Sequence, residues 1–283
     1  MKLIADSGST KTNWCLITNN SHKFYFDTEG YNPFYVNSEY IINSISKNLP
    51  DKIFRDEVME ISFYGAGCEI HKTDVIKNAM HQVFNNAMIT VDTDLLATAR
   101  ALLGNEPGFA AILGTGTNTC LYDGKSITTN IDSLGFLLGD EGSGGVIGKK
   151  IITDYIRGEM DEQTNYLFYN TYKITPQKLL ENLYSEPLYN RFCASYCKFL
   201  SLETINPDYR RHILLQAFNA FFKNLVSRYK NYNAYTFNCA GSVGFQFKDI
   251  LIEVAETFGM EVKLITKSVI NNLADYHIHK QIK

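Results

Sequence analysis

Hydrophobic positions in the N-terminal part of the chain follow two patterns, short apolar runs typical of buried strands and a helical spacing. Apolar runs predict strands at residues 3–5, 14–17, 23–26, 58–64 and 88–91. Apolar side chains that recur every three or four residues predict helices at residues 39–49, 73–85 and 95–103. The resulting order, β-β-β-α-β-α-β-α, fits a mixed sheet with helices on its faces, as in a ribonuclease-H-like domain.

The rest of the chain repeats the opening of this pattern and then becomes mainly helical. Strands are predicted at residues 110–113, 120–122, 236–240 and 261–265, and helices at about residues 146–157 and 269–276. Residues 176–229 are mainly helical, and a further helix follows residues 241–244 and ends near residue 258. One apolar stripe predicts core positions at Leu214, Leu215, Phe218, Phe221, Phe222 and Leu225. Two glycines and a proline at residues 104–108 predict a domain boundary, so we expect two α/β domains.

Two glycine turns that are rich in hydroxyl groups each lie between a pair of predicted strands. The first is Asp-Ser-Gly-Ser-Thr-Lys-Thr at residues 6–12, and the second is Gly-Thr-Gly-Thr-Asn at residues 114–118. Such turns let backbone N–H groups converge on an anion, although the same residues also make ordinary hairpin turns. The matched pair favours a duplicated phosphate site and therefore ATP chemistry. The GxxxxGK[ST] and GxGxxG patterns do not occur, which argues against a Walker NTPase and a Rossmann dehydrogenase.

Composition narrows the class of protein further. The chain has 283 residues, 45% hydrophobic and 20% charged, with a formal net charge of −3. This balance is typical of a soluble globular protein and lacks the basic excess expected of a nucleic-acid-binding protein. No signal-peptide segment or apolar run of about 18 residues is present, so we expect a cytoplasmic protein without a membrane partner. The six dispersed cysteines are expected to be free thiols.

Acidic or glycine-rich groups fall at or just after the predicted strand ends, where open α/β sheets build ligand sites. They are Asp6, residues 65–67, Asp94, residues 114–117, Asp140 and residues 241–244. A phosphoryl-transfer site needs hydrogen-bond donors that hold the phosphates and a carboxylate that organises Mg²⁺. It also needs a base for the acceptor hydroxyl and a surface for adenine. Each of these parts has a candidate in this chain.

Five segments, in order, resemble the N-acetylglucosamine kinase and BadF/BadG/BcrA/BcrD ATPase group of the actin, Hsp70 and sugar kinase superfamily. They are DSGSTKT from Asp6, VDTDLLATARALLG from Val91, ILGTGTN from Ile112, GFLLGDEGSGG from Gly135 and CAGSVG from Cys239. The resemblance implies two ribonuclease-H-like domains hinged around a cleft for ATP and sugar. It implies a first domain at residues 1–106, joined by a C-terminal helix at about residues 268–283, and a second domain at residues 107–267 with a helical insertion.

The resemblance also implies a role for individual residues. The phosphate-binding residues would be Ser7, Gly8, Ser9, Thr10, Lys11, Thr12, Gly114, Thr115, Gly116 and Thr117. The sugar would contact Asn32, Gly65, Ala66, Gly67, Asp94, Thr115 and Asp140, and the adenosine would contact Gly241, Ser242 and Val243. Asp6 would position Mg²⁺ through water, and Asp94 would take the proton from the sugar hydroxyl.

Two of these assignments, Asp94 and Asp140, have plainer alternatives. Asp94 stands at a strand-to-helix junction, where aspartate commonly acts as a helix N-cap, and Asp92 is the residue most easily confused with it. For Asp140, the alternative is that its carboxylate only stabilises a turn formed by the segment Gly-Asp-Glu-Gly-Ser. Asn32 is expected at the tip of a loop at residues 29–33.

The implied activity is an ATP- and Mg²⁺-dependent kinase for the 6-hydroxyl of an amino sugar, with N-acetylglucosamine the leading substrate. The family often has a tryptophan before the Gly-Asp-Glu-Gly-Ser segment, whereas this chain has Ser-Leu-Gly-Phe-Leu-Leu at residues 133–138. Glucosamine and N-acetylmuramate therefore stay open as substrates. The alternatives of another class are an ATPase that activates a dehydratase, as found in the same group, and a non-catalytic sugar sensor. The resemblance also allows a homodimer.

Overall fold

The computed structural model describes residues 1–8, 10–50, 53, 55–68 and 72–279. The chain divides into two compact units, which we describe separately. Unit 1 comprises Met1–Pro107, Tyr122–Ile127 and Ser268–Lys283, and unit 2 comprises Gly108–Leu121 and Thr128–Lys267.

Unit 1 contains a five-stranded sheet of order β3-β2-β1-β4-β5. Its strands are β1 (Lys2–Ser7), β2 (Lys11–Ile17), β3 (Lys23–Glu29), β4 (Glu60–Gly65) and β5 (Met88–Thr93). Strand β2 runs antiparallel to both β1 and β3, whereas β4 runs parallel to both β1 and β5. The central strand β1 is buried on both faces, because Leu3 and Ala5 enter one hydrophobic core while Ile4, of opposite orientation, is also fully buried.

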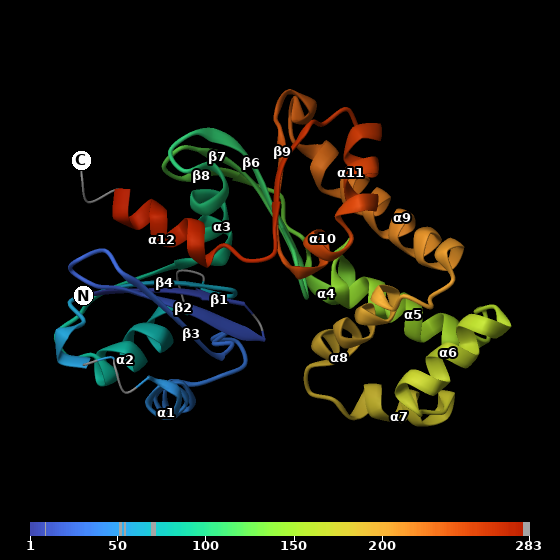
Figure 1. Ribbon diagram of the computed structural model, residues 1–283, viewed down its shortest axis with the longest axis horizontal. Helices are drawn as coiled ribbons and strands as arrows, with labels where there is room; N and C mark the ends of the chain where they lie inside the picture. The colour runs from blue at the N-terminus through green and yellow to red at the C-terminus, as the bar shows by residue number, and fades with distance from the viewer. Residues whose placement is uncertain (9, 51–52, 54, 69–71, 280–283) are drawn as a thin grey trace. The chain divides into compact units, whose positions relative to one another are not determined.

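Helices cover both faces of this sheet, as the sequence pattern predicts. They are α1 (Ser38–Asn48), α2 (Thr73–Val83), α3 (Asp94–Leu103) and α12 (Ile270–His279), with a short 3₁₀ turn η1 (Arg55–Glu57). Helices α1 and α2 lie together on one face, and α3 and α12 lie together on the other (Figure 1). Helix α12 therefore completes unit 1 although it comes from the far end of the chain.

Unit 2 contains a second five-stranded sheet, of order β10-β9-β6-β7-β8. Its strands are β6 (Pro107–Leu113), β7 (Thr117–Asp123), β8 (Ile127–Asn130), β9 (Phe237–Ala240) and β10 (Val262–Thr266). Raising each strand number of the first sheet by five gives this same order, and β9 again runs parallel to both of its neighbours. The predicted duplication of an α/β ribonuclease-H-like domain is thus confirmed.

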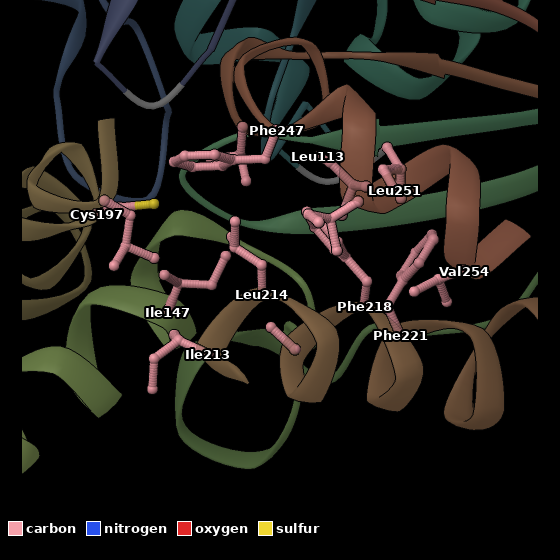
Figure 2. Packing of buried hydrophobic residues seen from close by; sticks show 14 of the residues in the cluster. Leu113, Ile147, Cys197, Ile213, Leu214, Phe218, Phe221, Phe247, Leu251 and Val254 are labelled. Carbon is pink, nitrogen blue, oxygen red and sulfur yellow. The ribbon is translucent and has the colours of Figure 1, made fainter. Parts of the chain in front are cut away.

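The helices of unit 2 are α4 (Gly135–Leu138), α5 (Gly144–Arg157), α6 (Glu162–Tyr172), α7 (Pro176–Ser185), α8 (Tyr189–Tyr196), α9 (Pro207–Asn224), α10 (Ser242–Gln246) and α11 (Lys248–Thr257). This unit also contains the 3₁₀ segments η2 (Cys197–Ser201), η3 (Val226–Arg228) and η4 (Tyr232–Ala234). Helix α9 runs beside α11, and its Leu214, Phe218 and Phe221 belong to the same cluster of buried side chains as Leu113 and Leu251 (Figure 2). The predicted apolar stripe is therefore core.

The structure differs from the expected elements at several places in unit 2, among them the short helix α4, which was not predicted. Strand β8 was not predicted, because it is a short edge strand whose residues are largely exposed. Helix α6 was also missed, since its tyrosine-rich sequence buries only Thr164 and Phe168 and so shows little helical periodicity. The single helix expected up to residue 258 is two helices, because Phe247 leaves the helical conformation and is buried in the core.

The described part of the chain can be checked for disulfide bonds, metal-binding clusters and membrane-spanning helices. All six cysteines are free and buried. Among the described residues no group of three or more His, Cys, Asp or Glu side chains could hold a metal ion. None of the described helices combines the length and the apolar character needed to cross a membrane.

Candidate active site

The carboxyl ends of the parallel strands in unit 1 bring several predicted residues to one edge of the sheet. Ser7 of β1 is in register with Gly65 of β4, which is in register with Thr93 of β5. Asp94 follows Thr93 directly, and Asp6 precedes Ser7. This is the edge at which open α/β sheets place their ligand sites.

Asp94 is the first residue of α3 and is not its cap. The cap is Thr93, whose side-chain oxygen accepts the N–H of Leu96 at 3.3 Å. The alternative interpretation of Asp94 as an N-cap is therefore wrong. Burial raises the pKa of Asp94 to about 6, although the backbone N–H groups of Leu95 and of Asp94 itself favour the ionised form.

Asp6 is the second perturbed carboxylate of this edge. Burial and then the negative charge of Asp94 raise its pKa to about 7, against a smaller lowering by a hydrogen bond with Asn13. A buried carboxyl group whose pKa is raised further by a neighbouring carboxylate marks a place of negative potential.

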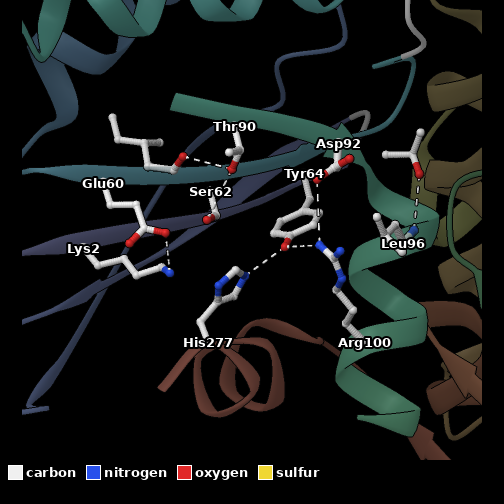
Figure 3. A network of polar contacts seen from close by, with 11 residues as sticks. Lys2, Glu60, Ser62, Tyr64, Thr90, Asp92, Leu96, Arg100 and His277 are labelled. Carbon is white, nitrogen blue, oxygen red and sulfur yellow. Dashed lines mark hydrogen bonds and ion pairs between the residues drawn. The ribbon is translucent and has the colours of Figure 1, made fainter. Parts of the chain in front are cut away.

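Asp92, the residue most easily confused with Asp94, has different neighbours. Its Oδ2 lies 3.8 Å from Nη1 of Arg100, and the same Nη1 donates to the hydroxyl of Tyr64 at 2.7 Å. The Tyr64 hydroxyl also lies 2.8 Å from Nε2 of His277 on α12 (Figure 3). Asp92 therefore belongs to a polar network between α3, β4 and α12.

The first glycine turn is held by its own hydroxyl groups. Thr12 Oγ1 donates to the carbonyl of Glu29 at 2.8 Å, so Ser7 Oγ must donate its proton to Thr12 Oγ1 across 2.7 Å. Ser7 Oγ in turn accepts the N–H of Tyr31 at 3.0 Å, and both hydroxyl residues are fully buried. These two hydroxyls have no proton left for a ligand in this conformation.

The accessible part of the first turn is smaller than the sequence pattern indicates. Gly8 is partly exposed and donates its N–H to the carbonyl of Lys11 at 2.9 Å, while Thr10 and Lys11 are exposed. The Lys11 ammonium pairs with Asp27 at 2.8 Å. Ser9, also predicted to bind phosphate, lies outside the described residues.

The predicted sugar contacts of unit 1 lie next to this turn. Ala66 donates its N–H to the carbonyl of Ser7 at 2.9 Å, which joins residues 65–67 to the first turn. Asn32 is buried in its loop and not exposed at the tip as expected, because its Oδ1 accepts the N–H of Phe34 at 3.0 Å. Gly67 has φ +74°, and a Cβ there would lie 2.5 Å from Asn32 Oδ1, so only glycine fits.

The second glycine turn, in unit 2, is held by the N-terminus of α5. The carbonyls of Gly114 and Thr115 accept the N–H groups of Gly144 and Gly145 at 2.8 and 3.0 Å. Gly114 N–H donates across the turn to Gly116 O at 3.0 Å. In the part of the chain that the structure describes, the N–H groups of Thr115 and Gly116 have no hydrogen-bond partner. Unpaired consecutive N–H groups on a glycine turn are suited to an anion.

Asp140 packs against the same turn. Its Oδ1 accepts the N–H of Thr117 at 3.1 Å, and its own N–H donates to the carbonyl of Ser133 at 2.9 Å. Burial raises the pKa of Asp140, while the hydrogen bonds from Thr117 and Ser133 oppose that shift. A Cβ on Gly116 would lie 3.1 Å from Asp140 Oδ2, so the second oxygen also faces the turn.

The predicted adenosine-binding segment completes this cluster. Gly241 has φ +126°, and a Cβ there would lie 2.3 Å from the carbonyl of Leu113, so the position requires glycine. Ser242 and Val243 begin α10, and a Cβ on Gly144 would lie 3.2 Å from Val243 Cγ2. Residues 114–117, Asp140 and residues 241–243 therefore meet within unit 2.

The predicted site residues thus lie in two clusters, one in each unit. Sequence reasoning did not assign a role to Thr93 or to the pair Gly144 and Gly145, which respectively cap α3 and hold the second turn. A threonine at a strand end just before an apolar helical run was the available signal for the cap. The role of the glycine pair depends on a contact about 30 residues away in sequence and has no local signal.

Comparison with solved structures links this arrangement to known proteins. Over 99% of this chain and 100% of the other, the structure is similar, at TM-score 0.92 and 33% identity, to a protein of Porphyromonas gingivalis named "putative N-acetylglucosamine kinase". A second structure of that name, from Chromobacterium violaceum, matches at TM-score 0.76 and 15% identity over 97% and 98% of the two chains.

A more distant match shows that the fold extends to other proteins. A ROK family glucokinase from Streptomyces griseus, solved with glucose and AMPPNP, is similar at TM-score 0.59 and 12% identity over 99% of each chain. At this identity the likeness concerns the fold alone. No family model and no curated protein sequence matches the chain.

Proposed function

This chain belongs to the N-acetylglucosamine kinase and BadF/BadG ATPase family of the actin-like fold, and on that premise we propose that it is an ATP-dependent amino-sugar kinase. The reaction is transfer of the γ-phosphoryl group of ATP to a sugar hydroxyl. We propose the 6-hydroxyl of N-acetylglucosamine as the acceptor, with glucosamine and N-acetylmuramate as the other candidates.

The state of Asp94 is the observation that carries this proposal. A sugar hydroxyl holds its proton at neutral pH, so a positioned base that accepts the proton during attack speeds the transfer. Asp94 has a pKa raised to about 6, and Thr93 performs the capping that would otherwise occupy the Asp94 carboxylate. A base of this pKa is ionised at neutral pH and still has useful proton affinity.

The chemical step follows from these roles. The acceptor oxygen attacks the γ-phosphorus, its proton passes to Asp94, and the bond between the γ-phosphorus and the β-phosphate oxygen breaks to release ADP. Asn32 and residues 65–67 are proposed to orient the sugar beside Asp94, because Gly67 and Ala66 connect them to the same sheet edge. In unit 2 we assign Thr115 and Asp140 to the sugar as well.

We propose that Asp6 positions Mg²⁺ through a bridging water molecule. Two carboxylates with raised pKa values make the potential negative where a divalent cation would be stabilised, and carboxylate oxygens suit Mg²⁺. When bound, the ion would neutralise charge on the β- and γ-phosphates.

The nucleotide is assigned to the two glycine turns and to residues 241–243. In the second turn, we propose that the unpaired N–H groups of Thr115 and Gly116 donate hydrogen bonds to the phosphates. In the first turn, Gly8, Thr10 and Lys11 are the accessible candidates, whereas Ser7 and Thr12 hold the turn in shape. Ser9 keeps its predicted phosphate-binding role, whereas Gly114 and Thr117 use their N–H groups within the second turn, toward Gly116 O and Asp140 Oδ1.

The test is coupled ADP release with ATP, Mg²⁺ and a panel of N-acetylglucosamine, glucosamine, N-acetylmuramate, N-acetylmannosamine and glucose. We expect one amino sugar to stimulate ADP release, and phosphorus NMR of the product to place the new phosphate on the 6-hydroxyl. If ATP binds but no sugar accelerates its turnover, the kinase proposal is rejected in favour of a sensor or an activating ATPase.

A further inference from the structure

We propose that Gly144 and Gly145, at the N-terminus of α5, are positioning residues that aim the N–H groups of the second glycine turn at the phosphates of the nucleotide. This inference rests on the proposed nucleotide-binding role of the turn. It assigns a function to two residues that do not themselves touch the ligand.

The hydrogen bonds between helix and turn determine which way the turn faces. A peptide unit points its carbonyl and the next N–H in opposite directions, so a held carbonyl also orients the amide that follows. Gly144 and Gly145 hold the carbonyls of Gly114 and Thr115. The N–H groups that follow those carbonyls belong to Thr115 and Gly116, the two that are unpaired among the described residues.

The helix end has no N–H left to bind an anion directly. Val146 N–H donates to Ser143 Oγ at 3.2 Å, and Ile147 N–H donates to Ser143 O at 3.0 Å. With Gly144 and Gly145 bonded to the turn, the first four helical N–H groups are all satisfied. The helix therefore acts through the turn, to which the positive end of its dipole also lies close.

The absence of side chains at these two positions permits the close approach. A Cβ on Gly145 would lie 3.1 Å from the carbonyl oxygen of Thr115 and 2.9 Å from Cδ2 of Phe136. A Cβ on Gly144 would lie 3.3 Å from Gly114 O and 3.2 Å from Val243 Cγ2. A methyl group at Gly145 thus pushes directly on the peptide that carries the aimed N–H of Gly116.

The experiment compares Gly145→Ala with Ile147→Val on the same helix turn. Ile147 is buried in the core of unit 2, so its truncation lowers stability without adding an atom toward the second turn. We would measure ADP affinity by calorimetry, KM for ATP and for the sugar separately, and the melting temperature of each variant.

We expect Gly145→Ala to weaken ADP binding and to raise KM for ATP at least about fivefold, a larger factor than for KM of the sugar, which Thr115 also contacts in the proposed site. Ile147→Val should lower the melting temperature and leave ADP affinity within about twofold. Gly145→Val, with a larger side chain, should weaken ADP binding further if it folds, and Gly145→Ala alone decides the matter if it does not.

The inference is overturned if folded Gly145→Ala binds ADP as the unaltered protein does, or if both variants weaken binding equally. It is also overturned if the unaltered protein binds no ADP. If ADP binds and Gly145→Ala weakens it while no sugar stimulates turnover, the inference stands and the kinase proposal fails.

Discussion

Asp94 and Asp6 show how single residues at a strand end acquire unusual properties. Both have raised pKa values, about 6 and about 7, and burial is the first cause in each case. For Asp6 the charge of Asp94 adds to the shift. The neighbouring Thr93 supplies the helix cap, which leaves Asp94 available for proton transfer.

Replacing the proposed base tests its role at this scale. We expect Asp94→Asn to lower kcat at least about 100-fold, because the amide cannot accept the hydroxyl proton, while ADP affinity by calorimetry changes little. Asp92→Asn is the matched control and should keep kcat within about threefold, since Asp92 pairs with Arg100. A fall of less than about tenfold for Asp94→Asn would reject the base assignment.

The raised pKa values also predict how activity depends on pH. Asp94 must be ionised to accept a proton, so kcat/KM should fall as pH decreases through about 7 to 6, where Asp6 and Asp94 become protonated. The measurement is kcat/KM between pH 5 and 9 with the preferred sugar. A kcat/KM that does not change down to pH 5 would contradict the proposed roles of Asp94 as the base and of Asp6 toward Mg²⁺.

The same raised pKa values predict that stability changes with pH in the opposite direction to activity: it decreases as pH rises. A carboxyl group whose pKa rises from 3.8 to about 7 on folding binds its proton more tightly in the folded state, so its contribution is present below about pH 4 and is lost as pH rises through 7. At pH 8 Asp6→Asn should therefore stabilise the protein by at least about 1 kcal/mol, since one pKa unit corresponds to about 1.4 kcal/mol. Urea unfolding at pH 8 and pH 4 checks this, and an equal gain at both pH values would disprove the charge explanation.

At the scale of elements, helix α12 is joined to β4 and α3 by a buried polar network. Tyr64 accepts a hydrogen bond from Arg100, contacts His277, and stays neutral because burial raises its pKa to about 12. The Nε atom of Arg100 is buried without a partner among the described residues, so the guanidinium depends strongly on the bonds of Nη1. The network secures the C-terminal helix to the sheet of unit 1.

Removing one hydroxyl tests this network. Tyr64→Phe should lower the free energy of unfolding by about 1–3 kcal/mol, because buried groups of Arg100 and His277 lose a partner. Denaturant unfolding measures the change, with Tyr184→Phe as the control because Tyr184 is 83% exposed. A loss below about 0.5 kcal/mol for Tyr64→Phe would mean that water replaces the hydroxyl at no cost.

At the scale of the whole molecule, the chain builds the same sheet twice and gives each copy its own core. Strand order and parallel pairing agree between the two sheets, and each unit has a separate cluster of buried apolar side chains. Unit 2 is the more elaborated copy, since helices α6, α7 and α8 are inserted between its hairpin and β9. Separate cores imply that damage in one unit is felt mainly there.

A core truncation in unit 2 tests that independence. Phe218 is fully buried, so Phe218→Ala should cost about 3–5 kcal/mol of stability. Hydrogen exchange should show a greater loss of protection in α9 and α11 than in β1 and β4. Phe63→Ala in unit 1 is the reciprocal variant. Equal loss in both units for either variant would show that the two cores unfold as one.

The order of strands and helices, and much of the candidate site, could be predicted from the sequence because their signals are local. Period-two and period-3.6 patterns depend on neighbours within a few residues, as in the stripe from Leu214 to Phe221. Glycine turns are equally local, since Gly67 and Gly241 are required by backbone angles. Where exposure or weak amphipathicity removed the local signal, in β8 and α6, the prediction failed.

Only the tertiary structure decided what the side chains at the site have left to offer. The protons of Ser7 and Thr12 are committed through a carbonyl at Glu29, and Asp6 is perturbed by Asp94, which lies far along the chain. Gly145 acts on Thr115, which lies about 30 residues earlier in the sequence. Hydrogen bonds and desolvation depend on distance in space, and the sequence by itself determines which groups exist but not which of them remain free.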